Sequence, residues 1–187
     1  MTAASGMDAL AHCVETFCSP AINPPGDAIA MDGLKRLFMN IERACEDGTD
    51  LHARWNMMMG AHEGSICFQK GLGAVHSVSH ALGALGYHHG TLNAILLPHV
   101  LRVNAPYISD KMTTMATVLR MPADADVPSV FARLNERLGL PEGLSDLGID
   151  PSIFPAIAKA ALADNAHKTN PYALTEADYI KLLNAAL

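Results

Sequence analysis

The sequence predicts an all-α domain, and three observations support this prediction. Apolar residues recur at the spacing of one helix face through most of the chain. Clusters of Gly, Pro, Asn and Asp separate these segments, as turn residues do. No segment shows the alternation of apolar and polar residues, bounded by hairpin turns, that is typical of a β-strand.

The first helix is expected over Ser5–Phe17, because its apolar residues recur at helical spacing. The segment Asn23–Asp27 (NPPGD) predicts a turn, and an amphipathic helix is expected to follow over Ala28–Ala44. A second turn over Glu46–Asp50 (EDGTD) precedes a helix over Leu51–Phe68. The consecutive methionines of that helix indicate core filling, because a flexible thioether adapts to irregular gaps.

Two shorter helices follow in the middle of the chain. The first is expected over Ala74–Leu82, stopped by Gly83 and Gly86. The second is expected over Thr91–Val103, with a kink at Pro98 because proline removes a helical hydrogen bond. Three more helices are expected over Ser109–Leu119, Val127–Leu138 and Pro151–Leu162. The last helix is expected to begin at a capping box formed by Thr175 and Asp178.

Length and composition favour a single domain with one hydrophobic core that needs no disulfide bonds to fold. The chain has 187 residues, of which 50% are hydrophobic, and this is within the range of a single domain. The net charge is −6, and the 13 Lys and Arg residues form no basic run. This composition argues against nucleic acid or an anionic membrane as a partner. The start of the chain also lacks the pattern of a signal peptide.

The cysteines show neither C-x-x-C spacing nor the density of a disulfide scaffold. They are Cys13, Cys18, Cys45 and Cys67. We expect reduced, mostly buried thiols of a cytoplasmic protein. Cys13 follows His12 directly, but neighbouring residues of a helix point about 100° apart, so Cys13 is expected to face the core.

The stretch Gly71–Leu101 contains no Asp, Glu, Lys or Arg, yet it holds five histidines. They are His76, His80, His88, His89 and His99. Glycines and Pro98 interrupt the stretch, so it is not expected to span a membrane. Imidazoles in so apolar a segment need partners, because an unpaired buried polar group is costly. A metal ion is one such partner.

Two pairs of residues have the spacing of ligands on one helix face. Asp8 and His12 are four residues apart. His76 and His80 repeat this spacing, and His89 follows in the same stretch. Residues four apart lie one turn apart on a helix, so each pair can direct two donors to one point. Carboxylate and imidazole donors without a thiolate suit Fe(II), Zn(II), Ni(II) or Mn(II). Such an ion can polarise a carbonyl or stabilise an alkoxide.

Simpler interpretations of these residues remain open. Ser5-Gly6-Met7-Asp8 fits a capping box, in which Asp8 would only complete a helix start. A single helical histidine such as His12 is more often half-buried than bound to a metal. Glu15 lies one more turn along the face, where a supporting role behind the metal and a solvated or capping role are both open.

Other motifs receive structural interpretations. Gly71-Leu72-Gly73 is a weak dinucleotide-loop signal, because no strand precedes it and His76 occupies the third glycine position. The other histidines are expected at the surface or behind the metal ligands (His52, His62, His167) or in a structural position (His99).

Several segments resemble the metal-binding half of the iron-containing alcohol dehydrogenases. They are GMDALAHCVE (Gly6–Glu15), GLGAVHSVSHALG (Gly71–Gly83), HHGTLNAILLPHVLRVN (His88–Asn104) and, similar to the family's ending, NPYALTEADYIKLLNAA (Asn170–Ala186). The resemblance runs through nearly the whole chain in the same order. It implies a multi-helix domain like the C-terminal half of the dehydroquinate synthase-like fold.

The resemblance also implies roles for individual residues. The implied metal ligands are Asp8, His12, His76 and His89. His80 is implied to be catalytic and to contact the cofactor, beside the nicotinamide and the substrate rather than on the metal. Two histidines precede Gly90, and His89 is assigned to the metal because it stands directly before that glycine. His88 is the second choice.

By the same resemblance, the expected activity is that of an alcohol dehydrogenase or aldehyde reductase. Fe(II), with Zn(II) as the other option, would polarise the oxygen of a small alcohol or aldehyde for hydride exchange with NAD or NADP. The metal, the choice of dinucleotide and the identity of the substrate stay open, as does a homo-oligomer.

Members of this family normally begin with a nucleotide-binding domain of comparable size, whereas Asp8 lies close to Met1. Residues 1–187 are therefore expected to form one helical metal-binding domain of a C-terminal fragment, without the N-terminal nucleotide-binding domain and inactive by itself. A truncated metal-binding module without catalysis is one alternative. A metal-assisted hydrolase of the His-Asp type is another, although the chain has no adjacent His-Asp pair.

Overall fold

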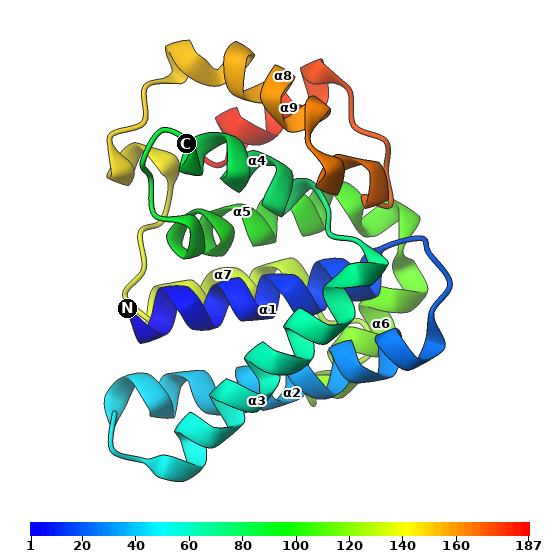
Figure 1. The fold of residues 1–187 in the computed structure, drawn as a ribbon, viewed down its shortest axis with the longest axis vertical. Helices are drawn as coiled ribbons and strands as arrows, with labels where there is room; N and C mark the ends of the chain where they lie inside the picture. Colours follow the sequence, from blue (N-terminus) through cyan, green and yellow to red (C-terminus); the bar gives the residue numbers. More distant parts are fainter.

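The computed structural model describes residues 1–187 and contains helices and no strand, as the sequence predicts (Figure 1). The α-helices are α1 (Thr2–Cys18), α2 (Pro24–Glu46), α3 (Leu51–Cys67), α4 (Ala74–Gly83), α5 (His89–Asn104), α6 (Ser109–Val118), α7 (Val127–Arg137), α8 (Phe154–Ala163) and α9 (Glu176–Ala185). Short 3-10 helices connect them: η1 (Phe68–Lys70), η2 (Ala105–Tyr107), η3 (Leu144–Leu147), η4 (Pro151–Ile153) and η5 (Asn165–Thr169).

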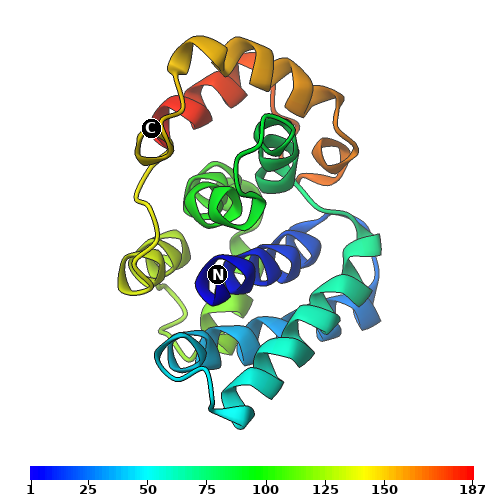
Figure 2. The ribbon, with the colours of Figure 1, turned by 60° about the vertical axis from the view of Figure 1, so that its left-hand side comes forward.

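Helix α1 lies in the middle of the fold and is buried on most sides. It packs against α2 and α3 on one side and against α5 on the other, and Figure 2 shows it between these two groups. Its side chains Met7, Leu10 and Val14 are completely buried. Helix α4 packs against both α5 and α8, and α9 packs against α8. Helix α5 therefore lies beside both α1 and α4.

The first helix begins earlier than expected, and this excludes one interpretation of Asp8. Helix α1 starts at Thr2 rather than Ser5. The Ser5 hydroxyl donates to the Met1 carbonyl at 3.2 Å, so Ser5 is an interior helical residue and not a cap. The capping-box interpretation of Asp8 is wrong. The Asp8 carboxylate is free to serve other partners.

The turn expected at NPPGD is the start of α2 instead. Asn23 is the N-cap, and its side-chain oxygen accepts from the Gly26 amide at 3.1 Å. Pro24 and Pro25 form the first helical positions, where a missing N–H costs nothing and the fixed φ angle suits a helix. The sequence interpretation failed because it took these prolines only as turn residues.

Helix α5 continues through Pro98, since a side chain replaces the missing hydrogen bond. Proline cannot donate to the carbonyl four residues earlier, which here belongs to Ala94. The Asn135 side-chain amide of α7 donates to that carbonyl at 2.6 Å. This bond also joins α5 to α7.

The end of the chain agrees with its sequence signals, except at one helix start. Pro151–Ile153 forms η4, and α8 begins only at Phe154. The predicted capping box is confirmed: Thr175 Oγ1 accepts from the Asp178 amide at 3.3 Å, and Asp178 Oδ2 accepts from the Thr175 amide at 3.0 Å.

The cysteines are free, and all but Cys45 are buried. This agrees with the expectation of mostly buried thiols. None of the helices combines the length and the apolar character that a membrane span requires.

Candidate metal centre

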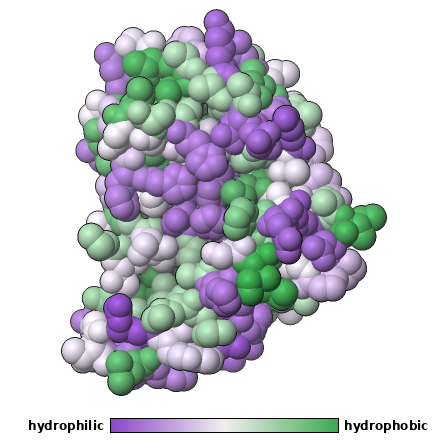
Figure 3. All heavy atoms as spheres, viewed as in Figure 1, coloured by the Kyte–Doolittle hydropathy of each residue, from purple (hydrophilic) through white to green (hydrophobic).

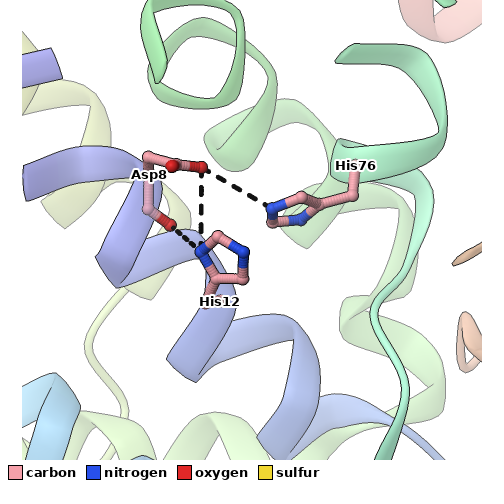
Figure 4. Close-up of side chains that lie close together, drawn as sticks. All are labelled: Asp8, His12 and His76. Carbon is pink, nitrogen blue, oxygen red and sulfur yellow. Dashed lines mark hydrogen bonds and ion pairs between the residues drawn. The ribbon is translucent and has the colours of Figure 1, made fainter. Parts of the chain in front are cut away.

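Helices α1, α4 and α5 bring one carboxylate and several imidazoles to a common point. Figure 4 shows the members from α1 and α4, which are Asp8, His12 and His76. Asp8 Oδ1 lies 3.6 Å from His76 Nε2 and 3.5 Å from His89 Nε2. His12 Nδ1 is 3.7 Å from the same oxygen. The structure therefore places the three predicted histidine ligands around the carboxylate of the fourth, Asp8. Donor atoms of Asp8, His12 and His76 all lie within 4.8 Å of one another.

The ring of His12 is oriented by its own helix. Its Nδ1 donates to the backbone carbonyl of Asp8 at 2.9 Å. The proton is thus held on Nδ1, which leaves Nε2 with a lone pair. The centroids of the His12 and His76 rings are 4.4 Å apart. In Figure 4 both rings approach the Asp8 carboxylate.

Glu15 orients the ring of His76 and begins its helix. Its Oε1 accepts from the Val75 amide at 2.7 Å, and its Oε2 lies 2.6 Å from His76 Nδ1. Only 5% of Glu15 is exposed, so the solvated interpretation is wrong. Glu15 caps α4 rather than its own helix, and it directs the Nε2 atom of His76 toward Asp8. A carboxylate behind a histidine is the usual support of a metal-bound imidazole.

Asn93 is a residue that the sequence interpretation missed. Its side-chain nitrogen donates to Asp8 Oδ1 at 2.5 Å and lies 3.1 Å from His89 Nε2 and 3.3 Å from His76 Nε2. Asn93 is completely buried, and its Oδ1 has no hydrogen-bond partner. A signal was present in the sequence, because Asn93 follows His89 by four residues and repeats the spacing of the other pairs.

His88 and His89 have different positions in the structure. His88 is the N-cap of α5, where its Nδ1 accepts from the Thr91 amide at 3.2 Å. His89 is the first residue of the helix, and its ring faces Asp8. The side chain of His88 is used by the helix start, which leaves His89 beside the carboxylate.

His80 lies at the edge of the cluster. Its ring stacks on that of His89, with centroids 5.4 Å apart and an angle of 14° between the planes. Its Nδ1 is 3.0 Å from Asp164 Oδ2, and 45% of its side chain is exposed. No local signal in the sequence pointed to Asp164, because 84 residues separate it from His80.

The electrostatics of the cluster favour a positive charge at its centre. Burial acts to raise the pKa of Asp8, but hydrogen bonds from His76 and Asn93 and the nearby His12 and His89 lower it to about 2. Burial acts to lower the pKa of His76, but its hydrogen bonds to Asp8 and Glu15 and their charges raise it to about 9. Burial is also the main cause that lowers the pKa of His12 and of His89.

These residues fit a divalent metal ion. The donors are one Asp8 carboxylate oxygen and the Nε2 atoms of His12, His76 and His89, with a second carboxylate behind His76. Two ligand atoms that share a tetrahedral ion at 2.0–2.2 Å lie about 3.3–3.6 Å apart. The separations of 3.5 and 3.6 Å from Asp8 Oδ1 agree with this. The side chain of the buried Asn93 also lies at this point through its nitrogen, while its Oδ1 has no hydrogen-bond partner.

The other histidines lie outside the cluster. His52 and His62 are exposed on α3. His167 Nδ1 is 3.0 Å from the Tyr179 hydroxyl. His99 is partly buried on α5, in a hollow that also includes Arg102.

Sequence comparisons connect this arrangement to one family. Residues 2–187 match the Fe-containing alcohol dehydrogenase family, C-terminal. The chain is 47% identical over 197 residues to the 4-hydroxybutyrate dehydrogenase of Cupriavidus necator, covering 100% of this chain and 52% of that protein. It is 35% identical over 196 residues to the 1,3-propanediol dehydrogenase of Citrobacter freundii, covering 100% of this chain and 51% of that protein.

Structural comparison gives the same result. The crystal structure of a 1,3-propanediol oxidoreductase superposes with a TM-score of 0.96 at 33% identity, covering 99% of this chain and 51% of that one. The chain thus spans about half the length of these relatives. The match over residues 2–187 and the agreement in fold show that the chain belongs to the Fe-containing alcohol dehydrogenase family, in its C-terminal region.

Proposed function

We propose that residues 1–187 form the helical metal-binding domain of a nicotinamide-dependent alcohol dehydrogenase or aldehyde reductase. Membership of this family supports a reaction that converts an alcohol to an aldehyde or the reverse. The names of the relatives suggest a short substrate with a second polar end, such as 4-hydroxybutyrate or 1,3-propanediol. The observation that carries the proposal is the convergence of His12, His76 and His89 around one oxygen of the Asp8 carboxylate.

These four residues would hold Fe(II) or, as the other option, Zn(II). When bound, such an ion supplies Lewis-acid polarisation of the substrate oxygen. Glu15 holds the ring of His76 with Nε2 toward Asp8, and Asn93 holds the Asp8 carboxylate. His80 stands at the exposed edge, where its ring can exchange a proton with substrate or water. The residues of the chain thus orient the donors and offer a route for the proton.

The dinucleotide, NAD or NADP, would be held mainly outside these 187 residues. A dinucleotide fold needs a strand, a glycine-rich loop and a helix to grip the pyrophosphate. Residues 1–187 contain no strand. The relatives are about twice as long as this chain. We therefore propose that a nucleotide-binding domain outside these residues completes the enzyme.

A metal analysis tests the first half of the proposal. The chain reconstituted with Fe(II) without oxygen should contain about one ion per molecule, as should the chain loaded with Zn(II). His76→Ala and His89→Ala should each lose the ion. His99→Ala is the matched control, because His99 lies in the same segment but outside the cluster, and it should retain the ion. Full metal content in both ligand variants would show that the ligand assignment is wrong.

An activity measurement tests the second half. The chain is fused to the part of the Cupriavidus necator relative that it does not match, and NADH or NADPH formation is followed with 4-hydroxybutyrate, 1,3-propanediol and short primary alcohols. Metal-dependent turnover is the expected result. A folded, metal-loaded fusion that oxidises none of these substrates would leave a metal-binding module without catalysis as the better description.

A further inference from the structure

The carboxylate of Asp164, outside the metal cluster, holds the ring of His80. Asp164 ends α8 and is the N-cap of η5. Its Oδ1 accepts from the Ala166 amide at 2.7 Å, and its Oδ2 lies 3.0 Å from His80 Nδ1. One carboxylate oxygen is therefore fixed by the backbone, and the other is directed at the imidazole.

This contact determines which nitrogen of His80 carries the proton. A carboxylate accepts hydrogen bonds, so His80 Nδ1 must be the donor, and the lone pair of the neutral ring stays on Nε2. The stacking on His89, at an angle of 14°, restricts rotation of the same ring. Tautomer and ring plane are thus both set before any substrate is present.

The surroundings of the pair are open to small molecules. His80 and Asp164 border a surface hollow of about 390 Å³, together with Phe68, Leu72, Asn165 and Thr169. The His80 side chain is 45% exposed, whereas that of Asp164 is 24% exposed. Figure 3 shows a hydrophilic band between more apolar regions on the face of the molecule that Figure 1 views. The imidazole can therefore reach both a substrate and water.

We infer that Asp164 is a positioning residue that keeps His80 Nε2 as the proton acceptor for the substrate hydroxyl. This inference rests on the proposed function. In the deprotonation that accompanies alcohol oxidation, the O–H bond breaks, its electron pair stays on oxygen, and the proton forms an N–H bond at Nε2. The two electrons of the oxidation would leave the carbon as a hydride, for which the NAD or NADP of the proposed function is the acceptor. Asp164 stabilises the resulting imidazolium, which then releases the proton to water. The reverse transfer serves aldehyde reduction.

The test compares two aspartates that cap 3-10 helices in the same way. Asp150 caps η4 by accepting from the Ser152 amide at 2.8 Å, and Asn is as good a cap as Asp. In Asp164→Asn the side-chain oxygen still serves Ala166, so its NH₂ group faces His80 and should move the ring proton to Nε2. Nitrogen-15 NMR of the Zn(II)-loaded chain reports the tautomer. We expect it to reverse in Asp164→Asn and to stay unchanged in Asp150→Asn.

Kinetics of the fused enzyme give the second measurement. Asp164→Asn should lower kcat by about 10²-fold or more, the scale of general acid–base catalysis, with little change in KM. Asp150→Asn should match the parent. The same tautomer in the parent and Asp164→Asn, or a reversed tautomer with unchanged kcat, would overturn the inference. A parent without turnover would overturn the proposed function instead, and the NMR comparison would still decide whether Asp164 positions His80.

Discussion

The carboxylate of Glu15 lies 2.6 Å from His76 Nδ1, although 61 residues separate the two in the chain. The same carboxylate accepts from the Val75 amide, so one side chain both starts α4 and orients the imidazole. Support of this kind fixes the tautomer that a metal-bound histidine needs. The proposed site therefore depends on Glu15 for the orientation of His76.

Glu15→Gln should weaken metal binding by about 10–100-fold, which is the usual effect of losing such a support. The Gln oxygen can still cap α4, but its NH₂ group would face His76 Nδ1 and disfavour a proton there. Calorimetric titration with Zn(II) measures the change. Glu46→Gln, at the exposed end of α2, serves as the control. Equal affinity in Glu15→Gln and the parent would contradict this role.

Substitution of Asn93 should weaken metal binding, whereas substitution of Asn135 should lower the stability of the fold. Asn93→Ala removes the hydrogen bond to Asp8, so we expect weaker Zn(II) binding. Asn135→Ala removes the donor to the Ala94 carbonyl and should cost about 1–3 kcal/mol of unfolding free energy without affecting the metal. Denaturant unfolding and Zn(II) titration measure the two effects. The prediction fails if Asn93→Ala binds Zn(II) as tightly as the parent.

His88 should contribute to the stability of α5, and His89 should contribute to metal binding. His88→Ala should retain the metal and lose about 0.5–2 kcal/mol of stability, because His88 caps α5. His88→Asn should recover that stability, since Asn is a good cap. His89→Ala should lose the metal. A large loss of metal in His88→Ala with little in His89→Ala would reverse the assignment.

Thiol labelling should find one accessible cysteine in the folded chain. Cys45 is exposed, whereas the other three are buried. Burial raises the pKa of Cys18 to about 12, so this thiol is also poorly ionised. A chromogenic disulfide reagent should therefore react quickly with one thiol per molecule and with all four after denaturation. Fast reaction of a second thiol in the native protein would show that the packing around α1 opens readily.

Residues 1–187 on their own should not oxidise alcohols at a measurable rate. Hydride transfer needs the nicotinamide held within about 3–3.5 Å of the reacting carbon. Positioning of this kind is worth roughly 7–11 kcal/mol of the barrier, so its loss should reduce turnover by many orders of magnitude. NADH or NADPH formation by the metal-loaded chain checks this. Steady metal-dependent turnover would require a dinucleotide site within these residues.

The sequence interpretation succeeded where the signals were local and failed where tertiary contacts decided. The helices around the site were predicted because their apolar residues recur at helical spacing. The start of α1 was misplaced, because Ser5-Gly6-Met7-Asp8 satisfies a capping pattern that an earlier start at Thr2 overrides. The prolines at Pro24 and Pro25 were taken as a turn, although the first positions of a helix also accept proline.

The sequence by itself determined which donors can share a helix face. Asp8 with His12, His76 with His80 and His89 with Asn93 are each four residues apart, and helix geometry alone directs each pair to one side. The tertiary structure decided which of these faces meet and what supports them. The contacts of Glu15 with His76 and of Asp164 with His80 span 61 and 84 residues. Helical periodicity relates residues only within a few turns, so such contacts exist only once α1, α4, α5 and the end of α8 have packed together.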